Sequence, residues 1–129
     1  MSRREVITLG AQYAELEFYR LQRYGAPFSL ILVCFEGQVP PTLEEALDGR
    51  IRKTDAVEML TECTLLIILG HTGRGEAGLA LKHLDPLFKG CNKPYHIATA
   101  TAGNDDQSAT DVLSRAIDEM GDYARCLEC

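Results

Sequence analysis

The sequence lacks the features that membrane, exported and nucleic-acid-binding proteins require. Its first residues contain only Val6, Ile7 and Leu9 as larger apolar side chains before polar residues return, which is far short of an export or membrane-spanning segment. Lys and Arg total 13 against 19 Asp and Glu, and a net charge of -6 argues against general affinity for a polyphosphate, although a local basic site is compatible with it. We therefore expect a cytoplasmic protein whose partners include neither a membrane nor a nucleic acid.

The cysteines lack the spacing of a disulfide framework. There are five of them, an odd number, which predicts reduced thiols in a cytoplasmic protein. Cys126 and Cys129 form a CxxC pattern, but a zinc site needs two more ligands at comparable spacing, and none of the three histidines supplies one. We expect a tail with two reduced thiols there, no bound metal and no cofactor.

What is present fits one globular domain over residues 1–129. Hydrophobic residues make up 46% and charged residues 25% of the chain, which is close to the average for folded domains. A chain of this length buries about two-thirds of the surface that its unfolded form exposes. A chain of this size needs neither a disulfide bond nor a bound metal in order to fold.

Hydrophobic periodicity predicts four helices and four strands. The longest apolar run, residues 28–35, is typical of a strand covered on both faces. Thr42 and Glu45 match a capping box, Pro86 should kink or restart the third helix, and Ser108 should cap the last one. The predicted order is helix 5–24, strand 28–35, helix 43–51, strands 56–60 and 64–69 as a hairpin, helix 77–88, strand 95–102 and helix 108–120. This pattern predicts an α/β (α+β) fold with a central mixed sheet flanked by helices.

Several segments, in this order, resemble a GGDEF (diguanylate-cyclase-like) domain. They are an Arg-containing helix followed by RYGAPFSL at 23–30, RKTDAV at 52–57, LLIIL at 65–69, the strand segment 99–103 and the helix 113–125. The resemblance covers nearly the whole chain. It implies the nucleotide-cyclase-like fold of that family and a role in bacterial signal transduction through cyclic di-GMP.

The active-site positions depart from the pattern of active GGDEF domains. Cys34 stands where the resemblance implies an acidic Mg²⁺ ligand, and Cys63 stands at the metal-binding acid of the signature, which reads TECTL at 61–65. Glu36 and Glu62 are nearby but occupy no metal position. Phosphoryl transfer needs metal ions held by carboxylates, so we expect no enzyme activity. We expect Cys34 and Cys63 to lie close together at one end of the sheet, as reduced thiols.

The resemblance also places an inhibitory RxxD site at Arg52 and Asp55. In the family, this Arg and Asp bind cyclic di-GMP, and Arg50 is a candidate for a further basic contact. The binding hypothesis requires both side chains to project to solvent at the turn before the hairpin. In the alternative interpretation, Asp55 caps local amides of the turn and Arg52 is merely solvated.

Three classes of function follow. The first is a catalytically inactive signalling domain that binds cyclic di-GMP. The second is a protein-interaction or self-association module of the same fold with no nucleotide ligand. The third, an enzyme of altered chemistry, would need a polar pocket and a perturbed thiol near Cys34 and Cys63. The loop 70–75 lacks the signature of a phosphate-binding loop, and we expect it to be a flexible connector.

Overall fold

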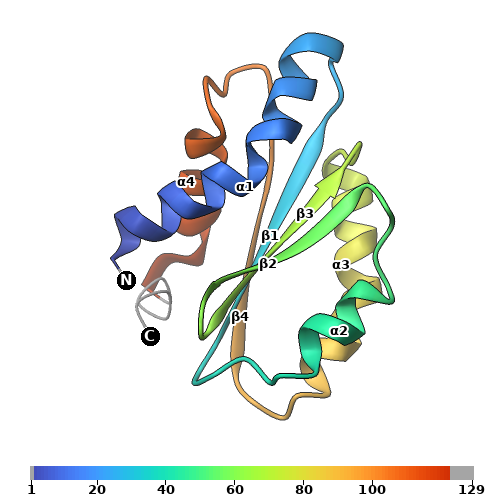
Figure 1. Cartoon of the computed structure of the whole chain (residues 1–129), viewed down its shortest axis with the longest axis vertical. Coiled ribbons are helices and arrows are strands. Elements are labelled where there is room, and N and C mark those ends of the chain that lie inside the picture. The colour runs from blue at the N-terminus through green and yellow to red at the C-terminus, as the bar shows by residue number, and fades with distance from the viewer. Residues whose placement is uncertain (1, 123–129) are drawn as a thin grey trace.

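A four-stranded sheet, with its strands in the order β2-β3-β1-β4, forms the centre of the molecule (Figure 1). The structure is a computed structural model, which describes residues 2–122. Its elements are α1 (Arg3–Tyr24), β1 (Phe28–Phe35), α2 (Leu43–Asp48), β2 (Asp55–Thr61), β3 (Thr64–Gly70), α3 (Arg74–Lys89), β4 (Tyr95–Thr101) and α4 (Ala109–Met120). The predicted order of elements and the α+β class are confirmed.

All three strand pairings are antiparallel, so the expected mixed sheet is corrected to an antiparallel one. The mixed sheet was expected because helices connect β1 to β2 and β3 to β4, and such connections often join parallel neighbours. Here each connection passes over one strand. Strand β3 lies between β1 and β2, and β1 lies between β3 and β4, so the strands that run parallel never touch.

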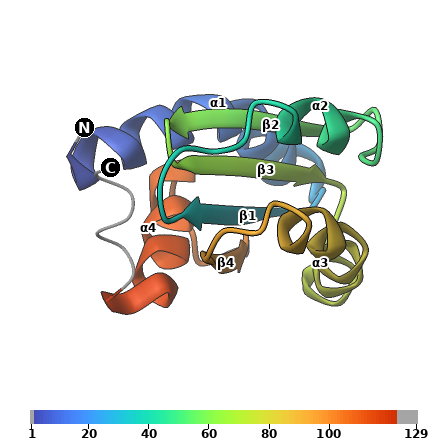
Figure 2. The same ribbon diagram turned by 90° about the horizontal axis from the view of Figure 1, so that it is seen from below.

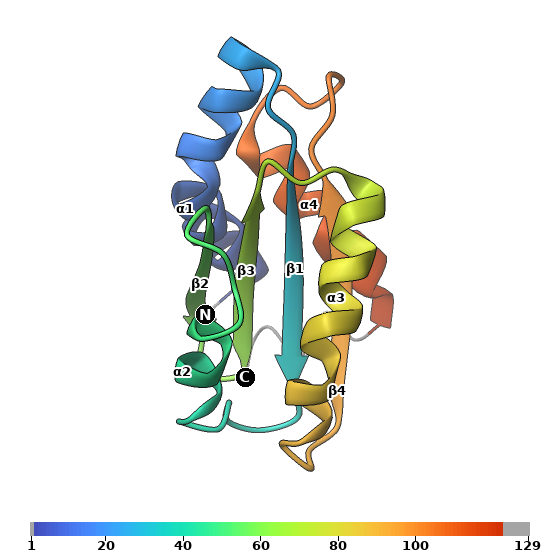
Figure 3. The same ribbon diagram turned by 90° about the vertical axis from the view of Figure 1, so that its right-hand side faces the viewer.

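The helices cover the sheet in two layers. Helices α1 and α4 pack on one face and α2 and α3 on the other, as Figures 2 and 3 show from two directions. Strand β1 serves both layers because successive side chains point to opposite faces. Leu30 and Leu32 join the core beneath α1 and α4, whereas Ile31 and Val33 join the core beneath α2 and α3.

The ends of α1 are fixed by local hydrogen bonds. The Ser2 side chain accepts a hydrogen bond from the Glu5 backbone, and the Glu5 carboxylate accepts one from the Ser2 backbone, which is a complete capping box. This geometry lowers the pKa of Glu5, chiefly through the hydrogen bond from the Ser2 backbone. Gly25 ends the helix in the left-handed conformation, with φ 69°, which glycine adopts without steric cost.

Three local expectations need correction. Thr42 precedes α2 as expected, but its backbone is helical (φ -86°, ψ -10°) and its side chain makes no capping hydrogen bond. Ser108 likewise precedes α4 without a side-chain capping bond. Helix α3 does not restart at Pro86 but continues to Lys89, since a proline in the last turn removes little of the hydrogen-bond ladder. Within residues 2–122, no helix combines the length and apolar character needed to cross a membrane.

Candidate functional site

Arg52 and Asp55 form a clasp at the turn between α2 and the hairpin. The Asp55 carboxylate accepts hydrogen bonds from the Arg52 backbone (3.0 Å), from Arg52 Nε (3.1 Å) and Nη2 (3.0 Å), and from the backbone of Gly70 (3.2 Å). Arg52 Nη2 also donates to the Gly70 carbonyl (2.8 Å) and to Thr72 Oγ1 (2.6 Å). The clasp therefore ties the start of β2 to the end of β3 and the following loop.

In the clasp, the Arg52 side chain is exposed to solvent and the Asp55 side chain is buried. The Arg52 side chain is 54% exposed, whereas that of Asp55 is only 3% exposed. The expectation that both side chains project to solvent is confirmed for Arg52 and wrong for Asp55, because four donors surround its carboxylate. Hydrogen bonding to Asp55 is also the main reason why the pKa of Arg52 is raised. The local-cap interpretation of Asp55 describes its observed contacts.

The loop after β3 is more than a connector. Thr72 is buried, its backbone donates to the Pro27 carbonyl (3.1 Å), and its own carbonyl accepts a hydrogen bond from the Ser29 hydroxyl (3.0 Å). These bonds attach the loop to β1 and hold Thr72 Oγ1 within reach of Arg52. The expected flexible connector is therefore wrong for this part of the loop.

Two hollows flank the exposed side of Arg52. One, of about 270 Å³, is lined by residues that include Arg50, Arg52, Leu79 and His83, and the other, of about 300 Å³, by residues that include Arg52, Thr72, Glu76 and Leu79. Arg50 and Arg52 both line the first hollow. Helix α3 supplies Leu79, which is 68% exposed, and His83, and no motif in the sequence pointed to either residue.

The degenerate active-site positions meet at the opposite end of the sheet. The Phe35 backbone donates to the Cys63 carbonyl (2.8 Å), and Thr64 Oγ1 donates to Cys34 Sγ (3.6 Å). The expected proximity of Cys34 and Cys63 at one end of the sheet is thus confirmed. Cys34 is fully buried in the core beneath α1 and α4.

The two cysteines differ in oxidation state. Cys34 takes part in no disulfide, as expected, but Cys63 is disulfide-bonded, so the prediction of a reduced thiol at Cys63 is wrong. Spacing along the chain could not reveal this bond, because disulfide pairing depends on which residues the fold brings together. Cys126 and Cys129, expected as a reduced pair, lie outside the described residues.

The acidic residues near these cysteines, Glu36 and Glu62, are both exposed. Glu36 Oε1 lies 3.8 Å from His96 Nε2, and the backbone carbonyl of Glu62 accepts a hydrogen bond from Val39 (2.8 Å). Among residues 2–122, no group of three or more His, Cys, Asp or Glu side chains is placed to hold a metal ion.

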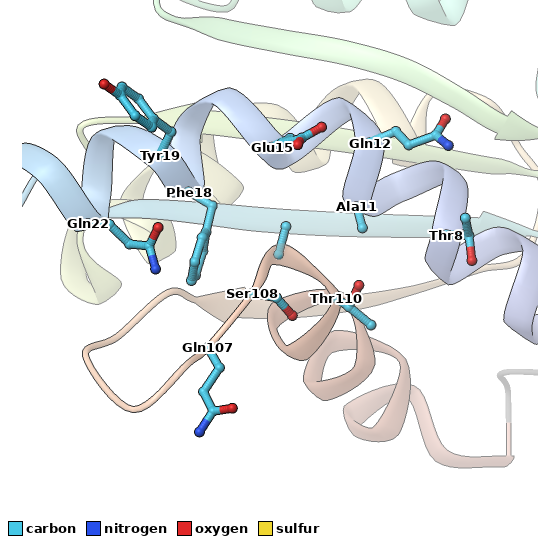
Figure 4. Close-up of a pocket in the computed structure, with 11 residues that line it drawn as sticks. Thr8, Ala11, Gln12, Glu15, Phe18, Tyr19, Gln22, Gln107, Ser108 and Thr110 are labelled. Atoms are coloured by element: carbon cyan, nitrogen blue, oxygen red, sulfur yellow. The ribbon is translucent and has the colours of Figure 1, made fainter.

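A third hollow, of about 470 Å³, lies between α1 and the start of α4 (Figure 4). Phe18 and Ala11 face α4 from α1, while Gln107, Ser108 and Thr110 come from the other side. Its polar groups are amides, hydroxyls and a single carboxylate. Sequence reasoning missed this groove, since scattered polar side chains on α1 and around the start of α4 form no recognisable motif.

The structure resembles solved GGDEF domains. A microbial GGDEF domain, described with a novel interaction mode with cyclic di-GMP, matches with a TM-score of 0.74 and 20% identity over 88% of this chain and 80% of that one. The FimX GGDEF domain of Pseudomonas aeruginosa matches with a TM-score of 0.65 and 16% identity over 90% of this chain and 88% of that one. The chain has the fold of GGDEF domains.

A third GGDEF-fold neighbour was solved with a protein bound. The diguanylate cyclase SiaD of Pseudomonas aeruginosa, in complex with its activator SiaC, matches with a TM-score of 0.73 and 16% identity. The match covers 92% of this chain and 54% of SiaD. No sequence-family model and no curated protein sequence matches the chain, so the likeness concerns the GGDEF fold.

Proposed function

We propose that this chain is a catalytically inactive GGDEF-like signalling domain that binds cyclic di-GMP at the face around Arg52. The proposed inactivity rests on Cys34 and Cys63, which stand at positions where the resemblance implies metal-binding acids. Cys34 is buried and Cys63 is disulfide-bonded. Neither side chain can supply the carboxylate oxygens that Mg²⁺ prefers, so neither can help to neutralise the charge that develops during phosphoryl transfer.

The activity test uses GTP and Mg²⁺ with the purified chain. We expect no cyclic di-GMP to form beyond the level of a boiled sample, with an active diguanylate cyclase as the positive control. Turnover that depends on Mg²⁺ and saturates with GTP would contradict the proposed inactivity.

The proposed ligand site uses the exposed edge of the clasp. Arg52 Nη1 makes no hydrogen bond within residues 2–122, and Arg50 lines the same hollow, so two guanidinium groups can meet one phosphodiester. Leu79 supplies an apolar wall against which a base can pack. The printed description of one neighbour, a GGDEF domain interacting with cyclic di-GMP, supports this choice of ligand.

Calorimetric titration with cyclic di-GMP tests the site. Arg52→Ala should weaken binding by about ten-fold or more, because a charge-assisted hydrogen bond contributes roughly 1.5–3 kcal/mol. Arg52→Lys should rescue little, since an ammonium lacks the planar fork. Lys53→Ala is the matched control, because Lys53 is an exposed neighbouring cation that lines neither hollow. Equal losses in both alanine variants, or no binding to the wild type, would remove the nucleotide proposal.

The second candidate is a protein-interaction module at the same face. The burial of Asp55 favours it, because a carboxylate with four donors is not available to a guanine while the clasp is closed. Exposed Leu79 would then anchor a protein partner, as large apolar side chains do at interfaces. The neighbour that was solved in complex with its activator supports the choice of a protein as partner. A wild type that does not bind cyclic di-GMP would favour this candidate.

A further inference from the structure

The turn between β2 and β3 carries a disulfide-bonded cysteine. Strand β2 ends at Thr61 and β3 begins at Thr64, and Cys63 lies between them. The Cys63 backbone N–H donates to Thr61 Oγ1 (3.2 Å), and the Cys63 carbonyl accepts a hydrogen bond from the Phe35 backbone (2.8 Å). These bonds attach Cys63 to the ends of β2 and β1, so one half of the disulfide is fixed at this end of the sheet.

The partner of Cys63 follows from the number of cysteines in the chain. There are five, at positions 34, 63, 91, 126 and 129. Cys34 and Cys91 take part in no disulfide bond. Because the bond forms within a single chain, only Cys126 and Cys129 remain as partners for Cys63. These two cysteines, which we call the CxxC pair, lie outside the described residues, and their assignment rests on this count.

The CxxC pair contains one sulfur more than the bond to Cys63 needs. Cys63 can bond to only one member of the pair, and the other member is then a thiol three residues away along the chain. At this spacing two sulfurs can bond to each other, as they do in the CxxC motif of thiol–disulfide oxidoreductases. A thiolate in this position can attack the disulfide of its neighbour within the same molecule.

We propose that Cys63 and the CxxC pair form a thiol–disulfide switch with two oxidised states. In the first state, Cys63 is bonded to one member of the pair. The thiolate of the other member attacks that bonded sulfur. A bond between Cys126 and Cys129 forms, the bond to Cys63 breaks, and Cys63 leaves as a thiolate that takes up a proton. One disulfide is lost and one is gained, so the exchange consumes neither an oxidant nor a reductant.

The two oxidised states constrain the chain differently. The bond from Cys63 closes a loop of roughly 63 to 66 residues, whereas a bond between Cys126 and Cys129 closes a loop of only about four. A cross-link that closes the longer loop restricts the unfolded chain more and therefore stabilises the fold more. The exchange should thus lower the melting temperature. It is independent of the proposed nucleotide site, because Asp55 lies at the other end of β2.

Mass spectrometry of tryptic peptides tests the pairing. The full chain is equilibrated with mixtures of reduced and oxidised glutathione, and its thiols are then blocked with N-ethylmaleimide. The first state gives peptide 54–74 linked to peptide 126–129, and the second gives blocked peptide 54–74 with an internal disulfide in 126–129. We expect both. Peptide 54–74 that is never linked to 126–129 at any mixture, or that is linked to the peptide of Cys34 or Cys91, would overturn the proposal.

The exchange step is tested by its pH dependence. The linked form, freed of glutathione, should convert to the second state about ten-fold faster for each unit that the pH rises below the pKa of the attacking thiol, because the thiolate is the nucleophile. Cys126→Ser and Cys129→Ser each lack the attacking thiol or the bonded one. Neither variant should convert to a state with an unlinked Cys63. Conversion in either variant, or a rate that does not change with pH, would exclude the exchange.

Thermal melts separate the switch from a general effect of oxidation. A dithiol reductant reduces the disulfide to two thiols and is itself oxidised to a disulfide, and it should lower the melting temperature of the linked wild type by roughly 5 °C or more. Cys63→Ser should melt at the same temperature with and without the reductant. Cys91→Ser is the matched control, because Cys91 forms no disulfide, and should keep the wild-type shift. A shift that persists in Cys63→Ser would contradict the proposal.

Discussion

Removal of the Asp55 carboxylate should be the most damaging single change in the turn before β2. Asp55→Ala deletes four hydrogen bonds and leaves the backbone N–H groups of Arg52 and Gly70 without this acceptor. An unsatisfied buried donor costs about 1–3 kcal/mol, and Gly70 is buried. Water reaches the Arg52 end, which reduces the loss there. We expect the free energy of unfolding to fall by about 2–4 kcal/mol.

Substitutions of Arg52 should lower the free energy of unfolding less than Asp55→Ala does. This ranking of the variants tests the role of the clasp more sharply than any single loss. Arg52→Ala leaves Asp55 with two backbone donors, and the lost guanidinium is half exposed, so a loss of about 1 kcal/mol is expected. Arg52→Lys should lose nearly as much, because an ammonium cannot contact Asp55, Gly70 and Thr72 at once. Lys53→Ala should be within about 0.5 kcal/mol of the wild type.

Urea unfolding followed by far-ultraviolet circular dichroism measures these differences, since the chain has no tryptophan to report by fluorescence. The slope of the transition should be the same in all four variants, so that midpoints compare directly. If Asp55→Ala were no more destabilising than Lys53→Ala, the clasp would contribute nothing to stability. An Arg52→Ala variant less stable than Asp55→Ala would contradict the assignment of Asp55 as the centre of the clasp.

Three further outcomes are expected from single side chains. Burial and the hydrogen bond to Asp85 raise the pKa of Tyr95 to about 12. The contribution of the neutral phenol to stability is therefore present below about pH 10 and lost as pH rises through about 12. In thermal melts recorded over a range of pH, Tyr95→Phe should remove this part of the alkaline loss of stability. Gly70→Ala would place a Cβ 2.5 Å from the Thr54 carbonyl oxygen and should lower the unfolding free energy by about 1–3 kcal/mol. Gly78→Ala, in α3 with open space around it, should instead raise it by about 0.5–1 kcal/mol, and a loss in the same urea titration would contradict this reasoning.

The sequence predicted the ranges of helices and strands better than it predicted which strands are neighbours in the sheet. Strand β1 matches its prediction, residues 28–35, because a continuous apolar run bounded by Pro27 and a polar loop has one plausible structure. The strand order β2-β3-β1-β4 could not be read in the same way. It depends on which strands each helical connection passes over, and hydrophobic periodicity carries no information on that choice.

The spacing of a capping box did not by itself predict a capping hydrogen bond. Ser2 and Glu5 form a complete capping box at the start of α1. Thr42 and Glu45 have the same spacing, yet the helical backbone of Thr42 leaves its hydroxyl without a capping hydrogen bond. The backbone conformation before a helix depends on the incoming chain, here the Pro40-Pro41 segment, and a four-residue pattern does not encode it.

The candidate site also depends on contacts that a local sequence pattern does not encode. The RxxD spacing correctly predicted that Arg52 and Asp55 meet at a turn. The surroundings of the pair, however, include Gly70, which donates to Asp55, and Thr72, which accepts from Arg52, and these residues lie 15 and 20 residues further along the chain. These contacts exist only because β2 and β3 pair as a hairpin. Leu79 and His83 reach the hollow from α3 for the same reason, and no local motif includes them.

The clasp also limits which ligands the Arg52 face can accept. A ligand that needs the Asp55 carboxylate must first open the clasp, and its apparent affinity falls by the fraction of molecules that are open. If opening costs even about 1.4 kcal/mol, that reduction is already about ten-fold. A ligand that approaches Arg52 Nη1 and Arg50 incurs no such cost, because Asp55, Gly70 and Thr72 hydrogen-bond only the Nε and Nη2 atoms of the Arg52 guanidinium. A phosphate group is therefore better suited to this face than a guanine edge, and if the proposed ligand binds here, its phosphodiester should be the primary contact of Arg52.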